Sequence, residues 1–228
     1  MLRTLLTCAL LMLWIGGAWA DVHDLTGGVM IVHAVPELSY TEPRPKGGYC
    51  DFCDLTRCED QVNQVSERPS IWFVISAWTE EKIFAGAEFG IGEYPSDLYV
   101  FLDDGPCWPM GMAIYHPDVR QWPGPNTGVA LATMKVDWKG QMVPIYWFAG
   151  YQYKGTGTVP LIESPRTNFS GWINGVERTK TFPAACLGAL GVGVPGVSCC
   201  PQAPDTTGGG APPGTEGSPE TEGAPQAE

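Results

Sequence analysis

The fold of this chain is decided by one stretch, Val143-Pro144-Ile145-Tyr146-Trp147-Phe148-Ala149-Gly150-Tyr151-Gln152-Tyr153. Its aromatic and β-branched side chains suit a pleated, half-buried surface, so the stretch is predicted to be the central strand of a sheet. Alternation places Tyr146 and Phe148 on one face and Trp147 on the other. Because large aromatic side chains are usually buried, we expect packing on both faces rather than a ligand platform. Pro144 lacks a backbone N–H and therefore belongs at a strand start, a bulge or an edge.

Apolar segments on either side of this stretch predict further strands, at 28–35, 71–78, 85–92, 98–102, 112–116, 128–138, 142–153, 156–163 and near 187–194. The pairs Lys139-Gly140 and Lys154-Gly155 predict hairpin turns, which would join three of these strands into a meander. Asp103-Asp104-Gly105-Pro106 is predicted to be a turn, and residues 54–65 are the candidate for one short helix. Eight or nine strands with regular turns predict an all-β sandwich, immunoglobulin-like or jelly-roll.

The two ends of the chain differ in composition from the middle. Residues 1–20 have Arg3, an apolar core at 5–15 and Ala18-Trp19-Ala20, which together predict a secretory signal peptide. The apolar core is shorter than the roughly 20 residues that span a bilayer. Residues 201–228 hold six Pro, six Gly and five acids without any aromatic residue, so we expect a disordered tail. One domain, 21–200, is predicted between them, in a secreted, extracellular or periplasmic protein.

The charge of the chain argues against two classes of partner. The full chain carries a net charge of −12. Without Arg3 and the five tail acids, residues 21–200 keep a net charge of −8 with 12 Lys and Arg. Binding to phosphate backbones relies on clustered basic residues, so nucleic acid is not an expected partner. After signal cleavage no membrane insertion is expected either.

Seven cysteines follow the predicted signal peptide, and in an exported protein they are disulfide candidates: Cys50, Cys53, Cys58, Cys107, Cys186, Cys199 and Cys200. We expect local bridges of Cys50 or Cys53 with Cys58, and of Cys186 with Cys199 or Cys200, with Cys107 taking a leftover partner. The odd number predicts a free thiol or an intermolecular bridge. A zinc site is the alternative for Cys50-x2-Cys53, but no second cysteine or histidine pair accompanies it.

No motif for a nucleophile, a catalytic zinc or a phosphate loop occurs, so no catalytic residue is assigned. Paired carboxylates are the remaining catalytic option, because a glycosidase uses two of them about 5–10 Å apart. The candidates gather in one third of the chain: Glu80, Glu81, Glu88, Glu93, Asp97, Asp103 and Asp104. Calcium is the one cofactor considered, with Asp97, Asp103 and Asp104 as its oxygen ligands.

Aromatic residues in loops are the candidates for ligand binding. Trp108 and Trp122 lie in Pro/Gly-rich segments, and Asn126 follows Trp122 in the same loop. Exposed aromatic rings there would suit sugar stacking or contact with a protein partner.

Four segments carry a resemblance: Gly86-x-Glu88-Phe89-Gly90-Ile91-Gly92, Gly105-Pro106-Cys107, Trp122-Pro123-Gly124-Pro125-Asn126 and Tyr146-Trp147-Phe148-Ala149-Gly150-Tyr151. This succession is similar to a group of secreted, β-rich bacterial proteins of unknown function. The resemblance implies a bacterial, exported, β-rich protein and nothing about chemistry. The order of strands also resembles cohesin-like and other immunoglobulin-like sandwiches of bacterial surfaces.

Together these features favour a secreted or cell-surface β-sandwich that is a non-enzymatic binding or structural module, with an extracellular protein or glycan as its partner. Three alternatives stay open: a carbohydrate-binding module, a secreted hydrolase using paired carboxylates, and a subunit of an extracellular filament or surface layer.

Overall fold

The computed structural model describes residues 21–45, 48–66, 68–107, 111–134 and 137–202. The predicted signal peptide, the tail from residue 203 and Trp108 lie outside these residues. The described chain is all-β, with two single-turn 3-10 helices, η1 (Cys50–Phe52) and η2 (Cys58–Asp60). Its strands are β1 (Val29–Val35), β2 (Gln64–Val65), β3 (Ser70–Ile91), β4 (Tyr99–Pro106), β5 (Met112–His116), β6 (Thr127–Ala132), β7 (Trp138–Gln152), β8 (Gly157–Ile162), β9 (Gly171–Asn174), β10 (Thr181–Pro183), β11 (Cys186–Leu187) and β12 (Ala189–Val192).

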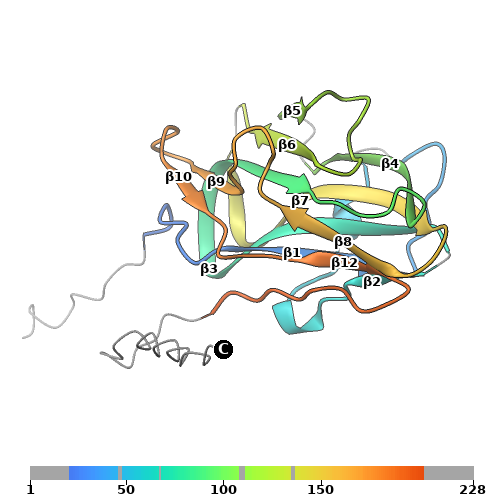
Figure 1. Cartoon of the computed structure of the whole chain (residues 1–228). Coiled ribbons are helices and arrows are strands. Elements are labelled where there is room, and N and C mark those ends of the chain that lie inside the picture. The colour runs from blue at the N-terminus through green and yellow to red at the C-terminus, as the bar shows by residue number, and fades with distance from the viewer. Residues whose placement is uncertain (1–20, 46–47, 67, 108–110, 135–136, 203–228) are drawn as a thin grey trace, which may run out of the picture.

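Strand β3 joins two segments that the sequence predicts as separate strands. It runs through 22 residues, and its exposed middle, Thr79 to Glu81, interrupts the pairing with β7 between Ala77 and Lys82. The first half pairs with β1 and β7. The second half pairs with the start of β7 through Lys82 to Phe84, and otherwise with β6, β8 and β9. Figure 1 shows β3 bending at one end of the molecule, so that it contributes to both layers of the sandwich.

The predicted meander is wrong, because β6, β7 and β8 do not pair with one another. Strand β7 pairs with β3 and β4, β6 pairs with β3 and β5, and β8 pairs with β12 and β3. Lys139 and Gly140 are not a turn: they lie inside β7, opposite Ile83 and Lys82. Trp138 stacks on Phe84 at a centroid distance of 5.2 Å, and this contact continues the ladder past the expected turn.

Two further local predictions fail in the same way. Asp103-Asp104-Gly105-Pro106 is part of β4 and pairs with β7, because both aspartates find partners on the faces of the sheet. Residues 54–65 form no helix beyond the single turn η2, and their last residues become β2. Strand β2 pairs with β12 in parallel, a contact across more than a hundred residues that no local pattern encodes.

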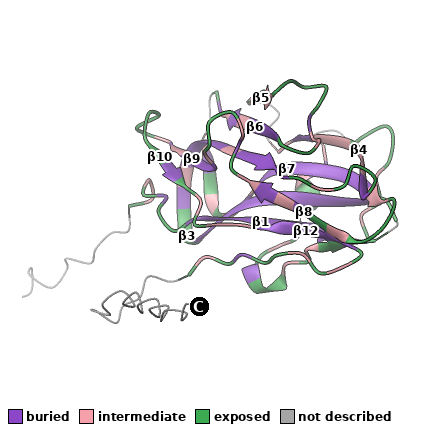
Figure 2. Cartoon of the chain, viewed as in Figure 1, coloured by how far each residue is buried: buried purple, intermediate pink, exposed green. Residues whose placement is uncertain are grey.

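The main core lies between the two layers of the sandwich. Residues of β7 and β3 dominate it, and Trp72 stacks on Phe148 with ring centroids 4.2 Å apart. Figure 2 shows the buried residues running along β1, β3, β7 and β12. Tyr146 and Phe148 belong to this core, and the register shift beside Pro144 is a bulge, one of the three positions expected for this proline. We call this cluster the inter-layer core; none of its members is a cysteine.

A second core covers the outer face of β1, β3 and β7. Its strand residues include Ile31, Phe73 and Trp147, the last of which is 1% exposed. Irregular chain covers this face, and we call it the stapled layer (residues 38–45, 48–60 and 196–200). Tyr49 packs edge-on against Trp147 at 4.9 Å between centroids. Aromatic packing on both faces of β7 is therefore confirmed. We call this second cluster the outer core.

All three disulfides of the described chain fasten the stapled layer. They join Cys50 to Cys107, Cys58 to Cys200, and Cys186 to Cys199. The local bridge predicted for Cys58 is wrong, because its partner is 142 residues away and is brought close only by folding. Cys186 pairs with Cys199, one of its two predicted partners. Cys107 pairs with Cys50, which the predicted local bridge could have used. Three disulfides indicate an oxidising environment, extracellular or periplasmic.

Cys53 is the unpaired cysteine among the described residues. Burial raises the pKa of its thiol to about 11, so it stays protonated at neutral pH. A protonated, partly buried thiol is a weak nucleophile. Within the described residues no helix is long and apolar enough to cross a bilayer.

Candidate functional site

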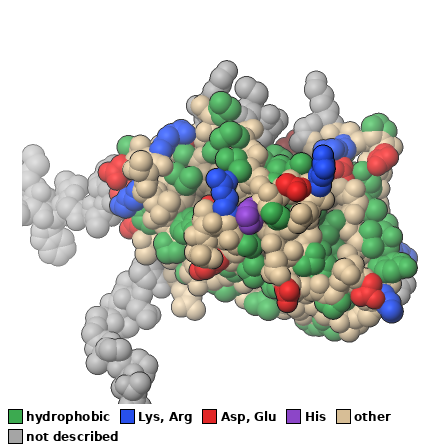
Figure 3. All heavy atoms as spheres, turned by 45° about the horizontal axis from the view of Figure 1, so that its top comes forward, with side chains coloured by type: hydrophobic (Ala, Val, Ile, Leu, Met, Phe, Trp, Pro, Cys, Tyr) green, Lys and Arg blue, Asp and Glu red, His purple; other side chains and the backbone are tan. Residues whose placement is uncertain are grey.

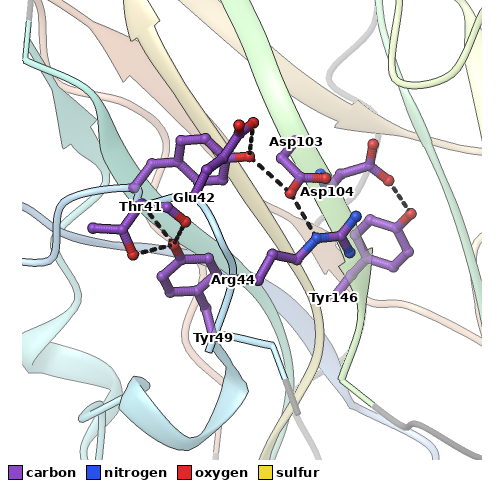
Figure 4. Close-up of polar contacts among 8 residues, drawn as sticks. Thr41, Glu42, Arg44, Tyr49, Asp103, Asp104 and Tyr146 are labelled. Atoms are coloured by element: carbon purple, nitrogen blue, oxygen red, sulfur yellow. Dashed lines mark hydrogen bonds and ion pairs between the residues drawn. The ribbon is translucent and has the colours of Figure 1, made fainter. Parts of the chain in front are cut away.

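The adjacent carboxylates Asp103 and Asp104 point to opposite faces of β4 (Figure 4). Asp103 faces the stapled layer, where its Oδ2 accepts hydrogen bonds from Arg44 Nε at 2.9 Å and from the Tyr40 hydroxyl at 3.1 Å. Its Oδ1 accepts from the backbone N–H of Asp104 at 2.9 Å. Oδ2 of Asp103 therefore holds the segment 40–44 against the sheet, whereas Oδ1 is engaged locally within β4.

A pocket of about 340 Å³ lies beside this contact, with Glu42 and Leu102 in its wall. The Tyr40 hydroxyl lies 3.0 Å from Glu42 Oε1 and 3.1 Å from Asp103 Oδ2. Burial and these two carboxylates raise the pKa of Tyr40, so it remains a phenol with a single proton to donate. The charges of this pocket are thus engaged with one another, which fits a structural contact better than a ligand site.

Asp104 faces the inter-layer core. Its Oδ1 accepts hydrogen bonds from Trp122 Nε1 at 3.0 Å and from the Tyr146 hydroxyl. Burial raises the pKa of Asp104, and these two hydrogen bonds oppose the shift. Burial and the Asp104 charge raise the pKa of Tyr146. Asp104, Trp122 and Tyr146 thus satisfy one another's hydrogen bonds within an aromatic core.

Trp122 is not exposed, contrary to its prediction: only 6% of it is accessible. Its indole N–H points inward and donates to Asp104 Oδ1 and to the hydroxyl oxygen of Tyr146, the latter at 2.9 Å. Tyr115 of β5 lies 6.0 Å from the indole, so Trp122 fills the space between β4 and β5. A local sequence pattern shows a Pro/Gly loop but not that its tryptophan folds inward.

Asn126 has a local explanation. Its φ of 54° is in the left-handed region that asparagine tolerates, and its side chain donates to Glu93 Oε1 at 3.0 Å. The residue is exposed, so the turn itself accounts for an asparagine there.

The carboxylates proposed for catalysis or calcium do not gather at one place. Asp97 pairs with Lys154 at 3.2 Å, and Glu88 accepts a hydrogen bond from Thr167 at 2.7 Å. Within the described residues no cluster of three or more His, Cys, Asp or Glu side chains is arranged to hold a metal ion. Of Glu88, Glu93, Asp97, Asp103 and Asp104, only Asp103 lines one of the four described pockets. This arrangement lends no support to the hydrolase alternative.

His33 is a buried histidine that the sequence does not mark. Its Nδ1 accepts a hydrogen bond from the backbone N–H of Val62 at 3.0 Å, so the ring proton of the neutral side chain is on Nε2. Nε2 lies 3.0 Å from Asp54 Oδ1 and donates to it. Because both ring nitrogens are engaged, His33 bridges β1 to the stapled layer and is not available as a base.

Among the described residues, strand β5 pairs with β6 alone and forms an edge of the sheet. Its outward side chains Met112 and Ile114 are 51% and 40% exposed. Ala132 and Ala130 of β6 lie opposite them and are partly exposed, so the surface continues across two strands. Figure 3 shows hydrophobic side chains among charged ones on the face that carries β5 and β6.

The largest of the four described pockets lies where β1 ends and β2 and β3 begin. Its volume is about 540 Å³, within the range of roughly 300–1,000 Å³ typical of small-molecule sites. Apolar atoms come from Pro36, Val62 and Val65. Polar side chains line the rest of it: Glu37, Gln64, Ser66, Arg68 and Ser70. We call it the Ser70 pocket.

Ser70 distinguishes this pocket from the one at Asp103. Its side chain is 4% exposed, and its hydroxyl oxygen has no hydrogen-bond partner among the described residues. Leaving a buried polar group unpaired costs about 1–3 kcal/mol, so a water molecule or a ligand in the pocket is expected to complete it. The side chains of Glu37, Gln64 and Arg68 also make no ion pair or hydrogen bond within the described chain.

Little in the sequence indicates this site. Ser70 opens a strongly apolar strand, and a mostly polar segment precedes it at 63–68, a pattern that also describes any solvated loop. Comparison of the chain with protein-family models, with curated proteins and with solved structures gives no match.

Proposed function

We propose that this protein is an exported, non-enzymatic binding module whose ligand occupies the Ser70 pocket. One observation carries the proposal: a buried hydroxyl lines a pocket, and neither it nor the charged side chains of the pocket have a partner among the described residues. The disulfide-fastened stapled layer suits a protein that works outside the cytoplasm. The described lining of the pocket holds no aromatic side chain, so sugar stacking, the basis of the carbohydrate-binding alternative, has no support there.

The proposal is tested by ligand-observed NMR screening of a soluble fragment library. Ser66→Trp places a large ring in the pocket from an exposed lining position, and Ser96→Trp is the matched control in an exposed loop outside the pocket lining. We expect compounds that bind the unmodified protein and Ser96→Trp but not Ser66→Trp. If no compound distinguishes the two tryptophan variants, the Ser70 pocket is not the binding site.

A second candidate, self-assembly into a filament or surface layer, is favoured by the free edge of β5. Edge strands are normally protected from pairing by charged residues or proline, and Met112 to His116 contains neither. The occupant would be the β5 strand of a second copy, paired edge to edge. Sedimentation velocity of the unmodified protein and Ile114→Lys distinguishes the two cases, because a strict monomer at high concentration removes this candidate.

A further inference from the structure

We propose that the Ser70 pocket takes a small zwitterion, namely an amino acid or short peptide with an aliphatic side chain; this inference rests on the proposed function. Glu37 follows β1 and Arg68 precedes β3, and both line the same pocket. They bring one negative and one positive charge to a single cavity, beside apolar atoms of Val62 and Val65.

The first step concerns the two charges. Neither Glu37 nor Arg68 makes an ion pair within the described residues, whereas Arg44 and Arg178 each contact an aspartate at 2.9 Å or less. A guanidinium binds a carboxylate with two parallel hydrogen bonds, and a carboxylate binds an ammonium group as a charge-assisted acceptor. A ligand that carries a carboxylate and an ammonium group pairs with Arg68 and Glu37 at the same time.

The second step concerns the neutral part of the pocket. Val62 is 38% exposed and lines the pocket together with Pro36, which provides an apolar surface for an aliphatic side chain. The Ser70 hydroxyl lacks a partner, so a hydrogen bond from it to the bound carboxylate relieves the cost of its burial. The amide of Gln64 adds a donor and an acceptor at the rim.

Other ligand classes match this lining less well. A phosphate-rich ligand carries two or more negative charges, and Glu37 repels them beside a single Arg68. A sugar lacks the charges that would engage either side chain. A purely apolar ligand would leave the charged pair and Ser70 unsatisfied. The zwitterion is the class whose groups correspond one to one with the unengaged side chains.

The test is isothermal titration calorimetry of the full protein with three probes: leucine, N-acetylleucine, which lacks the ammonium group, and leucinamide, which lacks the carboxylate. We expect leucine to bind most tightly and each analogue to bind about tenfold more weakly or worse, the effect of one lost charge-assisted hydrogen bond. Titration with the dipeptide Leu-Leu shows whether the pocket prefers a free amino acid or a short peptide, since both carry an ammonium group and a carboxylate.

Variants assign each charge to its residue. In Glu37→Gln, leucine and N-acetylleucine should bind equally, and in Arg68→Gln, leucine and leucinamide should bind equally. Arg120→Gln and Glu163→Gln are exposed controls outside the pocket lining and should bind like the unmodified protein. Equal affinity for all three probes, or no effect of Arg68→Gln, would overturn the inference.

The two proposals fail differently. If some compounds lose binding in Ser66→Trp but none of them is a zwitterion, the Ser70 pocket remains a binding site and the zwitterion is removed as its ligand. An absence of any compound sensitive to Ser66→Trp would remove both. All substituted side chains are exposed, so loss of the fold does not confuse the outcome.

Discussion

The two faces of β7 carry cores built by different means. On the inner face, Phe148 packs against Trp72 between regular strands, and no disulfide contributes to the cluster. On the outer face, Trp147 is covered by the stapled layer, which has few backbone ladders and three disulfides. Strand pairing satisfies backbone groups and orders side chains by itself, whereas irregular chain needs covalent links to offset its larger conformational entropy. The comparison predicts that the two cores respond differently to the same perturbation.

The largest effect is expected from the inter-layer core. Phe148→Ala should lower the free energy of unfolding by about 3–5 kcal/mol, because a fully buried ring leaves a cavity. Guanidinium unfolding followed by tryptophan fluorescence measures it. The control Tyr153→Ala, at a 65% exposed residue of the same stretch, should change stability by at most about 0.5 kcal/mol. Similar losses for both variants would contradict the assignment of this core.

The disulfide that closes the longest loop is expected to come next. Replacing both Cys58 and Cys200 by serine should cost about 2–4 kcal/mol, because the unfolded chain regains its freedom. Hydrogen exchange should accelerate in the stapled layer and along β2, and much less in β6 and β8. The control Cys53→Ser removes the unpaired thiol and leaves all three bridges intact. Uniform acceleration across both layers would show that the two cores are one cooperative unit.

Asp104 should make the inter-layer core sensitive to pH. Its folded-state pKa is raised, so the folded protein holds the proton more tightly than the unfolded chain does. Its stabilising contribution is therefore complete below the ordinary aspartate pKa of about 4 and is lost as pH rises through the folded value. Relative to Asp104→Asn, the unmodified protein should lose stability from about pH 4 upward. Asp97→Asn, at an exposed ion pair, is the control, and parallel pH profiles of Asp104→Asn and the unmodified protein would contradict this prediction.

The smallest effect is expected at the edge of the stapled layer. Arg44→Ala removes an ion pair with Asp103, but the arginine side chain is 55% exposed, so the loss should be about 0.2–1 kcal/mol. Thermal unfolding at low and high salt measures it, since screening should shrink the difference. A loss above about 2 kcal/mol would mean that the pair fixes the whole segment 40–44, well beyond a surface contact.

The candidate site shows where prediction from sequence stops. The all-β class and the central position of 143–153 follow from local periodicity and residue type, whereas residue type alone left a strand start, a bulge or an edge open for Pro144. Trp122 and Asp104 could not be placed, because their burial depends on each other across 18 residues. The Ser70 pocket is built from the segments around 37, 64 and 70, and no short pattern links them.

The sequence by itself determined the strand periodicity, the acidic charge, the use of cysteines as disulfides and the packing of aromatic residues on both faces of β7. These properties depend on neighbouring residues, which local sterics and hydrophobicity decide. Only the tertiary structure decided which strands pair, which cysteines bridge and which polar side chains lie unengaged beside a pocket. Those outcomes depend on contacts between distant segments: Cys58 meets Cys200, and β3 bends to serve two layers, because burial of the whole apolar surface favours that arrangement over local alternatives.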